Sequence, residues 1–243
     1  MFFCNFKPQK KGMKLLLTIF IFLAGFSILA QETKPISPII EVDSLYREDQ
    51  FYINFAFANI QNKPKSFKLT KISPSISLGF IRDFPLNKNR TVAIALGLGY
   101  TFTKLNENIS INTITNIPQY SIISGQQFDK NKLLLHYIDI PLEIRWRTST
   151  PESHVFWRIY SGFKVSYLID DRYKFKDAST DSNTSKNTDL NKLQYGAYIA
   201  AGRNTWNFYA YYGITPLFKS SAKINNETIG LNVFNMGLMF YIL

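Results

Sequence analysis

Cysteine is almost absent from this 243-residue sequence, and histidine is scarce. The single cysteine, Cys4, precedes a hydrophobic segment, and the two histidines are His136 and His154. Disulfides, cysteine-based metal sites and thiol chemistry are therefore not expected in the chain beyond that segment. The histidines fall in different predicted elements, so neither is placed to orient a nucleophilic serine. Since no His, Asp and Glu grouping has the spacing of metal ligands, we expect no enzymatic activity, no cofactor and no metal.

Long hydrophobic runs are limited to one segment near the N-terminus. Residues 15–30 are apolar, follow several lysines and end in small residues before Gln31. This pattern predicts a cleaved signal peptide over residues 1–30, because the run is short for a helix that spans a bilayer. Residues 31–49 have mixed charges and no sustained period, and we expect an irregular periplasmic lead-in there.

Acidic residues are outnumbered, with 17 Asp and Glu against 28 Lys and Arg and a formal net charge of +11. Four of these units are lysines of the signal region, which leaves +7 on the exported chain. Nucleic acid is not an expected partner, because no run of Lys and Arg accompanies the excess. Attraction to anionic lipid headgroups or lipopolysaccharide in the outer membrane is the simpler account.

Helical periodicity is missing beyond the signal region, whereas a period of two recurs. In residues 91–104, TVAIALGLGYTFTK, large apolar side chains alternate with Ala, Gly and Thr. Such alternation indicates a strand with one broad apolar face. Similar patterns predict eight strands, at residues 51–58, 71–81, 91–104, 132–147, 155–169, 193–202, 205–214 and 229–243.

The connections between these strands alternate strictly in length. Outer-membrane barrels have short periplasmic turns and long external loops, whereas a soluble sandwich has no reason to sort its loops in this way. We therefore predict an all-β fold, an eight-stranded antiparallel up-and-down transmembrane β-barrel over residues 50–243, in the outer membrane of a Gram-negative bacterium. The long connections are residues 59–70, 105–131, 170–192 and 215–228, and the short ones are 82–90, 148–154 and 203–204.

All three tryptophans fall at one end of this barrel. Trp146 ends a predicted strand, and Trp157 and Trp206 begin others, so each is expected on the lipid-facing side at the periplasmic rim. We interpret them as an aromatic girdle. A general preference of aromatic residues for strands explains their presence but not their collection at one end.

Charged residues gather on the predicted lumen face of two neighbouring strands. They are Asp139, Glu143, Arg145, Arg147, Arg158 and Lys164. An eight-stranded barrel is just wide enough for its side chains to fill it, and buried charges must be paired to be tolerated. We favour a salt-bridged plug that holds the barrel shut, and keep open an ion path or a conformational switch. Pro74 and Pro141 would each remove a ladder hydrogen bond, so a bulge or a strand end is expected at both.

A short motif in the middle of the chain resembles a known family. The string Tyr137-Ile138-Asp139-Ile140-Pro141-Leu142-Glu143-Ile144-Arg145, with the GLGY of residues 97–100, is similar to the PorT-like outer-membrane β-barrel family, porin-family proteins common in Bacteroidetes. The resemblance covers about residues 50–243 and implies an outer-membrane barrel. It also makes an accessory role in type IX secretion a hypothesis.

Two function classes follow. The first is an integral outer-membrane barrel with a structural or surface-interaction role and no open pore. Its long loops, above all residues 105–131 and 170–192, would either contact a surface protein, a glycan or secretion machinery, or be merely solvated. The second is a soluble lipocalin-like lipid carrier with its apolar faces turned inward. We favour the first, because a Gly, Ala and Ser exterior would be a poor water-facing surface.

Overall fold

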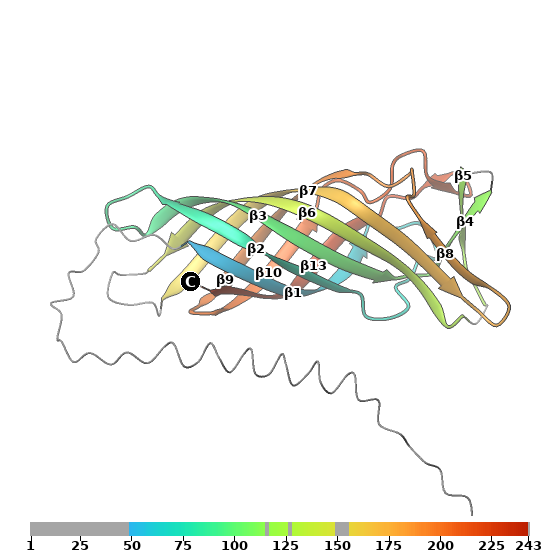
Figure 1. Ribbon diagram of the computed structural model, residues 1–243, viewed down its shortest axis with the longest axis horizontal. Coiled ribbons are helices and arrows are strands. Elements are labelled where there is room, and N and C mark those ends of the chain that lie inside the picture. Colours follow the sequence, from blue (N-terminus) through green and yellow to red (C-terminus); the bar gives the residue numbers. More distant parts are fainter. Residues whose placement is uncertain (1–48, 115–116, 126–127, 149–155, 243) are drawn as a thin grey trace, which may run out of the picture. The chain divides into compact units, whose positions relative to one another are not determined.

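Eight antiparallel strands close into one barrel in the computed structural model, which describes residues 49–114, 117–125, 128–148 and 156–242 (Figure 1). Each strand pairs with the next along the chain, the last pairs with the first, and the prediction of a closed eight-stranded barrel is confirmed. The strands are β1 (Gln50–Gln61), β2 (Pro74–Pro85), β3 (Val92–Asn106), β6 (Lys130–Arg147), β7 (Trp157–Lys176), β9 (Leu193–Arg203), β10 (Trp206–Gly213) and β13 (Asn232–Ile242). The predicted signal peptide and most of the lead-in lie outside the described residues. Within the described ranges, no helix is long and apolar enough to cross a membrane.

The large apolar side chains point outward all round the barrel. The exposed fraction of these side chains is between 61% and 78% for Phe51, Leu98, Ile144 and Phe208, which lie on four different strands. Neighbours along the strands, such as Tyr52 beside Phe51 and Arg145 beside Ile144, are buried inside. An apolar exterior around a small-residue and polar interior suits a barrel in lipid and is the reverse of a lipid carrier.

The two prolines behave differently. Pro74 is the first residue of β2, which is the strand end expected for it. Pro141 lies inside β6, so the expected bulge or strand end there is wrong. The β3–β6 ladder omits two residue pairs beside Pro141 and resumes in the same register, because proline removes a donor without lengthening the strand. The register of the β6–β7 ladder shifts instead between His136 and Tyr137, where β7 carries one extra residue, Ile169.

Two strands run further than predicted, one at each end of the barrel. β2 continues past residue 81 to Pro85, at the end with the short turns, where it stays paired with β3. β7 continues past residue 169 to Lys176 at the opposite end, where the chain forms a folded extension. The long connections, predicted as external loops, contain strands of their own. These are β4 (Ile109–Ile114) paired with β5 (Ile117–Ile122), β8 (Asp181–Ser185) paired with the end of β7, and β11 (Lys223–Ile224) paired with β12 (Glu227–Thr228). We call this extension, together with the connections that join it, the cap.

Candidate functional site: a blocked lumen beneath a folded cap

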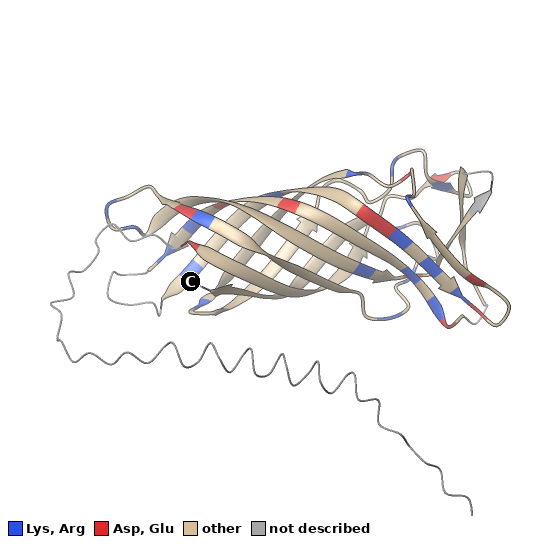
Figure 2. Cartoon of the chain, in the orientation of Figure 1, with Lys and Arg blue, Asp and Glu red and all other residues tan. Residues whose placement is uncertain are grey.

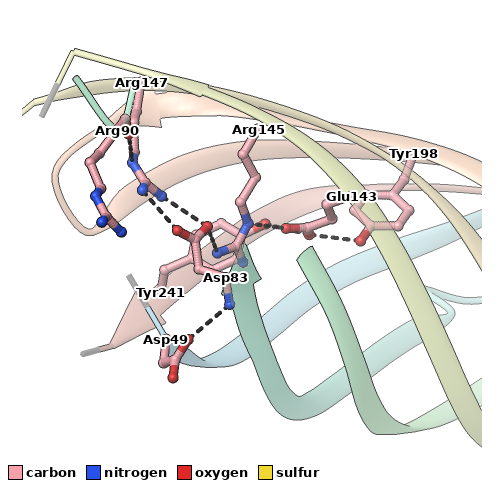
Figure 3. A network of polar contacts seen from close by, with 8 residues as sticks. All are labelled: Asp49, Asp83, Arg90, Glu143, Arg145, Arg147, Tyr198 and Tyr241. Carbon is pink, nitrogen blue, oxygen red and sulfur yellow. Dashed lines mark hydrogen bonds and ion pairs between the residues drawn. The ribbon is translucent and has the colours of Figure 1, made fainter. Parts of the chain in front are cut away.

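A buried ion-pair network crosses the lumen near the end that carries the short turns (Figure 3). Arg147 on β6 donates from Nη1 and Nη2 to the two carboxylate oxygens of Asp83 on β2, at 2.9 and 2.8 Å. Arg145 donates to the same carboxylate at 3.0 Å. All three side chains are completely buried. Arg147 also donates from Nε to the backbone oxygen of Arg90, which ties the network to the β2–β3 turn.

Glu143 extends this network across the barrel. Its carboxylate accepts a hydrogen bond from Arg145 Nε at 2.7 Å, and from the hydroxyls of Tyr198 on β9 and Tyr241 on β13 at 2.7 and 3.1 Å. The guanidinium of Arg145 also lies over the ring of Tyr160, 4.7 Å from its centroid. Three strands, β6, β9 and β13, are therefore joined through one carboxylate, and hydrogen bonds to both of its oxygens compensate its burial.

Small residues on the lumen face make room for these long side chains. Ala93 and Ala95 on β3 lie between Asp83 and the two arginines, so the arginines reach across a whole strand. Gly162 on β7 lies directly against the ring of Tyr198, where a Cβ would overlap the ring. The alternation of Gly and Ala with large outward residues therefore provides the lumen space for the polar network.

A second polar layer lies nearer the cap. Lys164 on β7 forms an ion pair with Asp139 on β6 at 3.2 Å, and its ammonium lies 4.6 Å from the ring centroid of Tyr211. Thr101 on β3 donates a hydrogen bond to the same carboxylate. Beside this pair is a cavity of about 30 Å³, also lined by Gln194. A cavity of that size holds about one or two water molecules.

Arg158 is the cation of the lumen with the fewest polar contacts. It is buried, and its guanidinium lies 4.5 Å from the ring centroid of Phe156 and within 6 Å of those of Tyr160 and Tyr241. Its Nε and Nη1 find no hydrogen-bond partner in the described part of the chain. Stacking on aromatic faces is the interaction that a guanidinium makes best in such surroundings.

The cap has a hydrophobic core of its own, which lies over the end of the lumen opposite the short turns. It draws side chains from the barrel strands and from all the long connections. Leu105, Ile109, Leu133, Leu135, Leu190, Leu217, Phe218, Ile229 and Leu231 are nearly or completely buried in it. The hydroxyl of Tyr120 on β5 lies within hydrogen-bonding distance of Asn187 and Asp189, which links the β4–β5 hairpin to the β8–β9 connection. The long connections are thus packed together around shared apolar side chains.

One carboxyl group is buried inside this cap without a partner. Glu107 follows β3 and is completely buried, and neither of its oxygens has a hydrogen-bond partner among the described residues. Burial raises the pKa of the Glu107 carboxyl to about 8, because the charged form would lose its hydration with nothing in exchange. Near neutral pH this group is therefore close to its titration point.

The structure places the predicted site residues as follows. Asp139, Glu143, Arg145, Arg147, Arg158 and Lys164 are all buried inside the barrel. Trp146, Trp157 and Trp206 are exposed on the outer wall at the end with the short turns, at 47%, 58% and 63%. Their roles as a plug and as an aromatic girdle stay predictions.

The two histidines are a separate case. His136 points outward from β6 and contacts Tyr100 and Phe102. His154 lies outside the described residues. Among the described residues, no three His, Cys, Asp or Glu side chains gather in a way that would hold a metal ion.

Sequence reasoning missed Asp83, the central carboxylate of the network. Residues 82–90 were predicted as a turn, although the period of two continues from Ile81 to Asp83 on the inner face of β2. Following that alternation past the charged residues would have placed Asp83 in the lumen. Glu107 and the cap core had no comparable signal, because their apolar residues are spread over several connections and only the fold brings them together.

A barrel with apolar walls, short turns at one end and a cap at the other matches a known family. Residues 29–219 match the family model for the outer membrane protein beta-barrel domain. The chain belongs to this family. It is an outer-membrane β-barrel protein, and because barrels of this kind have their short turns in the periplasm, the cap is on the external side. The match does not distinguish the PorT-like group, so that finer resemblance stays a prediction.

Two solved structures are similar to this chain. Both are of Ail, the attachment invasion locus protein of Yersinia pestis, one of them in complex with the heparin analogue sucrose octasulfate. The identities are 14% and 13% and the TM-scores 0.35 and 0.32, over 81% of this chain and 100% of the Ail chain. A comparison with curated proteins finds no match.

Proposed function

We propose that this protein is a closed anchor in the outer membrane and that its function resides in the cap, as a structural or surface-interaction protein. The observation that carries the proposal is the double block along the barrel axis. The ion pairs around Asp83 and Glu143 fill the periplasmic half of the lumen, and the apolar cap core lies over the external half. The cavity between them has room for about one or two waters, which does not suit a pore for solutes.

The cap is suited to hold a binding surface in place. Its hairpins pack on a common core and are joined by hydrogen bonds such as those of Tyr120. Binding residues commonly lie on loops that a rigid scaffold positions. A surface protein or a glycan is the class of partner that such a cap would meet. An accessory role in secretion would likewise act through the cap rather than through the lumen, and no catalytic step belongs to this proposal.

Planar-bilayer recording of the purified protein tests the closed lumen. We expect no steady channels across a range of voltages and salt concentrations. Steady large channels from the wild-type protein would contradict the proposal. The matched comparison is a variant in which Arg145, Arg147 and Arg158 are all replaced by Ala, because emptying the periplasmic layer should raise leakage if that layer contributes to the block.

Co-purification from native outer membranes tests the cap. The β4–β5 hairpin, residues 109–122, would be replaced by a short Gly-Ser turn, and in a control the periplasmic residues 87–90 would be replaced in the same way. A partner that is recovered with wild type and with the control, but lost with the hairpin replacement, would support the proposal. Equal recovery with all three proteins would argue that the cap is not the binding surface.

A further inference from the structure

Four lysines gather on the outer wall of the barrel, on three neighbouring strands. Lys104 is on β3, Lys130 and Lys132 are on β6, and Lys174 is on β7, and we call these four the lysine patch. Lys132 on β6 lies directly opposite Lys174 on β7. Lys104 on β3 lies opposite Leu134, two positions from Lys132 on β6. Blue segments recur along the external ends of β6 and β7 in Figure 2. The four residues are spread over 70 positions of the chain, so the sequence alone showed no basic cluster.

The side chains of the lysine patch point away from the cap core. Each lysine alternates with a buried neighbour. These neighbours are Leu105 beside Lys104, Asn131 beside Lys130, Leu133 beside Lys132 and Tyr173 beside Lys174. The period of two in a strand therefore places the ammonium groups on the outer wall, where the lipid and its headgroups lie.

The lysine patch carries no ion pair of its own. In the described part of the chain no carboxylate oxygen lies within 4.0 Å of any of the four ammonium groups. The cations that flank the patch are paired: Arg172 with Asp170 and Lys176 with Asp181, both at 3.7 Å. Like charges placed opposite each other on neighbouring strands destabilise a sheet. An anion supplied from outside the chain would remove that repulsion.

The height of the patch on the barrel wall indicates where such an anion lies. On β6, Trp146 and His136 are ten residues apart and carry exposed or half-exposed rings on the outer wall. A rise of about 3.3 Å per residue and a tilt of about 45° convert this spacing to about 23 Å, close to the apolar band of about 25 Å in outer-membrane barrels. His136 hydrogen-bonds with the Tyr100 hydroxyl at 2.5 Å, and such polar-tipped aromatic groups are typical of the membrane interface.

The lysine patch follows directly beyond this interface. Lys132 is four residues past His136 on the same strand, which is about 9 Å further along the membrane normal. This is the level of the lipid headgroups, which lie just outside the hydrocarbon core. Lysine side chains are long enough to reach back toward that level with their ammonium groups.

We propose that the lysine patch binds the phosphate groups of lipopolysaccharide in the outer leaflet. Lysine recognises phosphate as a point charge, and several lysines on one wall provide for more than one phosphate on the same lipid. A lipid is favoured over a soluble polyanion because the patch faces sideways at headgroup level instead of lying on top of the cap. The assignment uses the outer-membrane location and the barrel wall, and it does not depend on what the cap binds.

Native mass spectrometry of the full-length protein, purified in detergent, tests the assignment. The probes are lipid A with both phosphates and lipid A from which the phosphates have been removed. Wild type should retain the diphosphoryl lipid at least about tenfold better than the phosphate-free lipid, and retention should weaken as salt is raised. The fourfold variant K104Q/K130Q/K132Q/K174Q should lose about tenfold of the retention, whereas the corresponding fourfold Lys→Arg variant should keep it.

The matched control removes the same charge elsewhere at the external end. The variant K63Q/K192Q/K219Q/K223Q changes four exposed lysines of the long connections and should bind lipid A as wild type does. Equal retention of the two lipids by wild type would overturn the proposal even if the fourfold Gln variant failed to fold. Wild-type retention by the folded fourfold Gln variant would also overturn it. Displacement of lipid A by equimolar inorganic phosphate would overturn it as well. A third probe is a heparin fragment: if the fourfold Gln variant lost binding of this fragment but kept lipid A, the patch would belong to a soluble glycan site and the proposal would be overturned.

Discussion

Arg147 on β6 and Asp83 on β2 form a two-point ion pair across the intervening strand β3. Both side chains are completely buried, and Arg145 shares the same carboxylate. The pair forms because Ala93 and Ala95 on β3 leave the space that the arginines cross. The Asp83 carboxylate therefore bridges two buried guanidinium groups, and Glu143 supplies the second negative charge to Arg145. Much of the lumen network depends on Asp83.

Replacing Asp83 by Asn should destabilise the barrel strongly. The variant keeps the shape of the side chain but removes the carboxylate that pairs with Arg147, whereas Arg145 keeps its ion pair with Glu143. Breaking a buried pair in this way costs about 3–5 kcal/mol. The free energy of unfolding, measured by urea titration in lipid vesicles, is the readout. The control is Asp181→Asn, which breaks an exposed pair and should change stability by less than about 1 kcal/mol. A D83N variant as stable as the control would contradict this account of the network.

Gly162 should tolerate no side chain while Tyr198 is present. A Cβ at this position would overlap the ring of Tyr198, and moving that ring would break its hydrogen bond to Glu143. We expect Gly162→Ala to lower the unfolding free energy by about 1–3 kcal/mol, as other overpacked interiors do. In a Tyr198→Leu background the same change should cost clearly less, because residues in contact are not additive. Equal costs in both backgrounds would exclude this contact as the cause. Ser161→Ala, on the exposed face next to Gly162, serves as the matched control.

The barrel could be predicted from the sequence to a large extent, and the site only in part. Strands such as β3 alternate large apolar with small residues, and this local pattern predicts which side chains share a face. The alternating connection lengths then favoured lipid on the apolar side. Asp83 and Glu107 were missed for different reasons. Asp83 lies in a charged segment that was predicted as a turn, although the alternation of β2 continues through it. Glu107 is buried only because distant connections fold over it. The lysine patch likewise exists only through the register of β3, β6 and β7, which a sequence does not display.

The cap should loosen as pH rises, because of Glu107. Its pKa of about 8 in the folded cap lies above the usual value near 4.5, so the folded state binds the proton more tightly than the open state. The stabilisation is complete below about pH 4.5, decreases by up to about 1.4 kcal/mol per pH unit above it, and is lost beyond about pH 8. Hydrogen exchange of the β4 amides, corrected for the intrinsic rate, should show this decrease between pH 5 and 8.

Glu107→Gln should remove that pH dependence. The amide has nearly the same shape and no charge, so the cap of this variant should open equally rarely at pH 5 and pH 8. Tyr173 is close enough to feel the charge of Glu107, but its phenol stays protonated throughout this pH range. Glu227→Gln changes an exposed carboxylate of the cap and should leave the wild-type pH profile intact. If the Glu107→Gln variant kept the wild-type slope, another group would be responsible.

The position of the lipid belt can be tested on a single strand. Ile140 is 49% exposed and lies between His136 and Trp146 on β6, whereas Leu134 lies two residues beyond His136, toward the lysine patch. An arginine in the apolar band of a barrel costs about 2–4 kcal/mol, and one near the interface about 0–1 kcal/mol. Ile140→Arg should therefore lower the unfolding free energy in vesicles by several times more than Leu134→Arg does. Equal losses of unfolding free energy in the two variants would mean that the apolar band is misplaced along β6. The headgroup level assigned to the lysine patch would then be wrong as well.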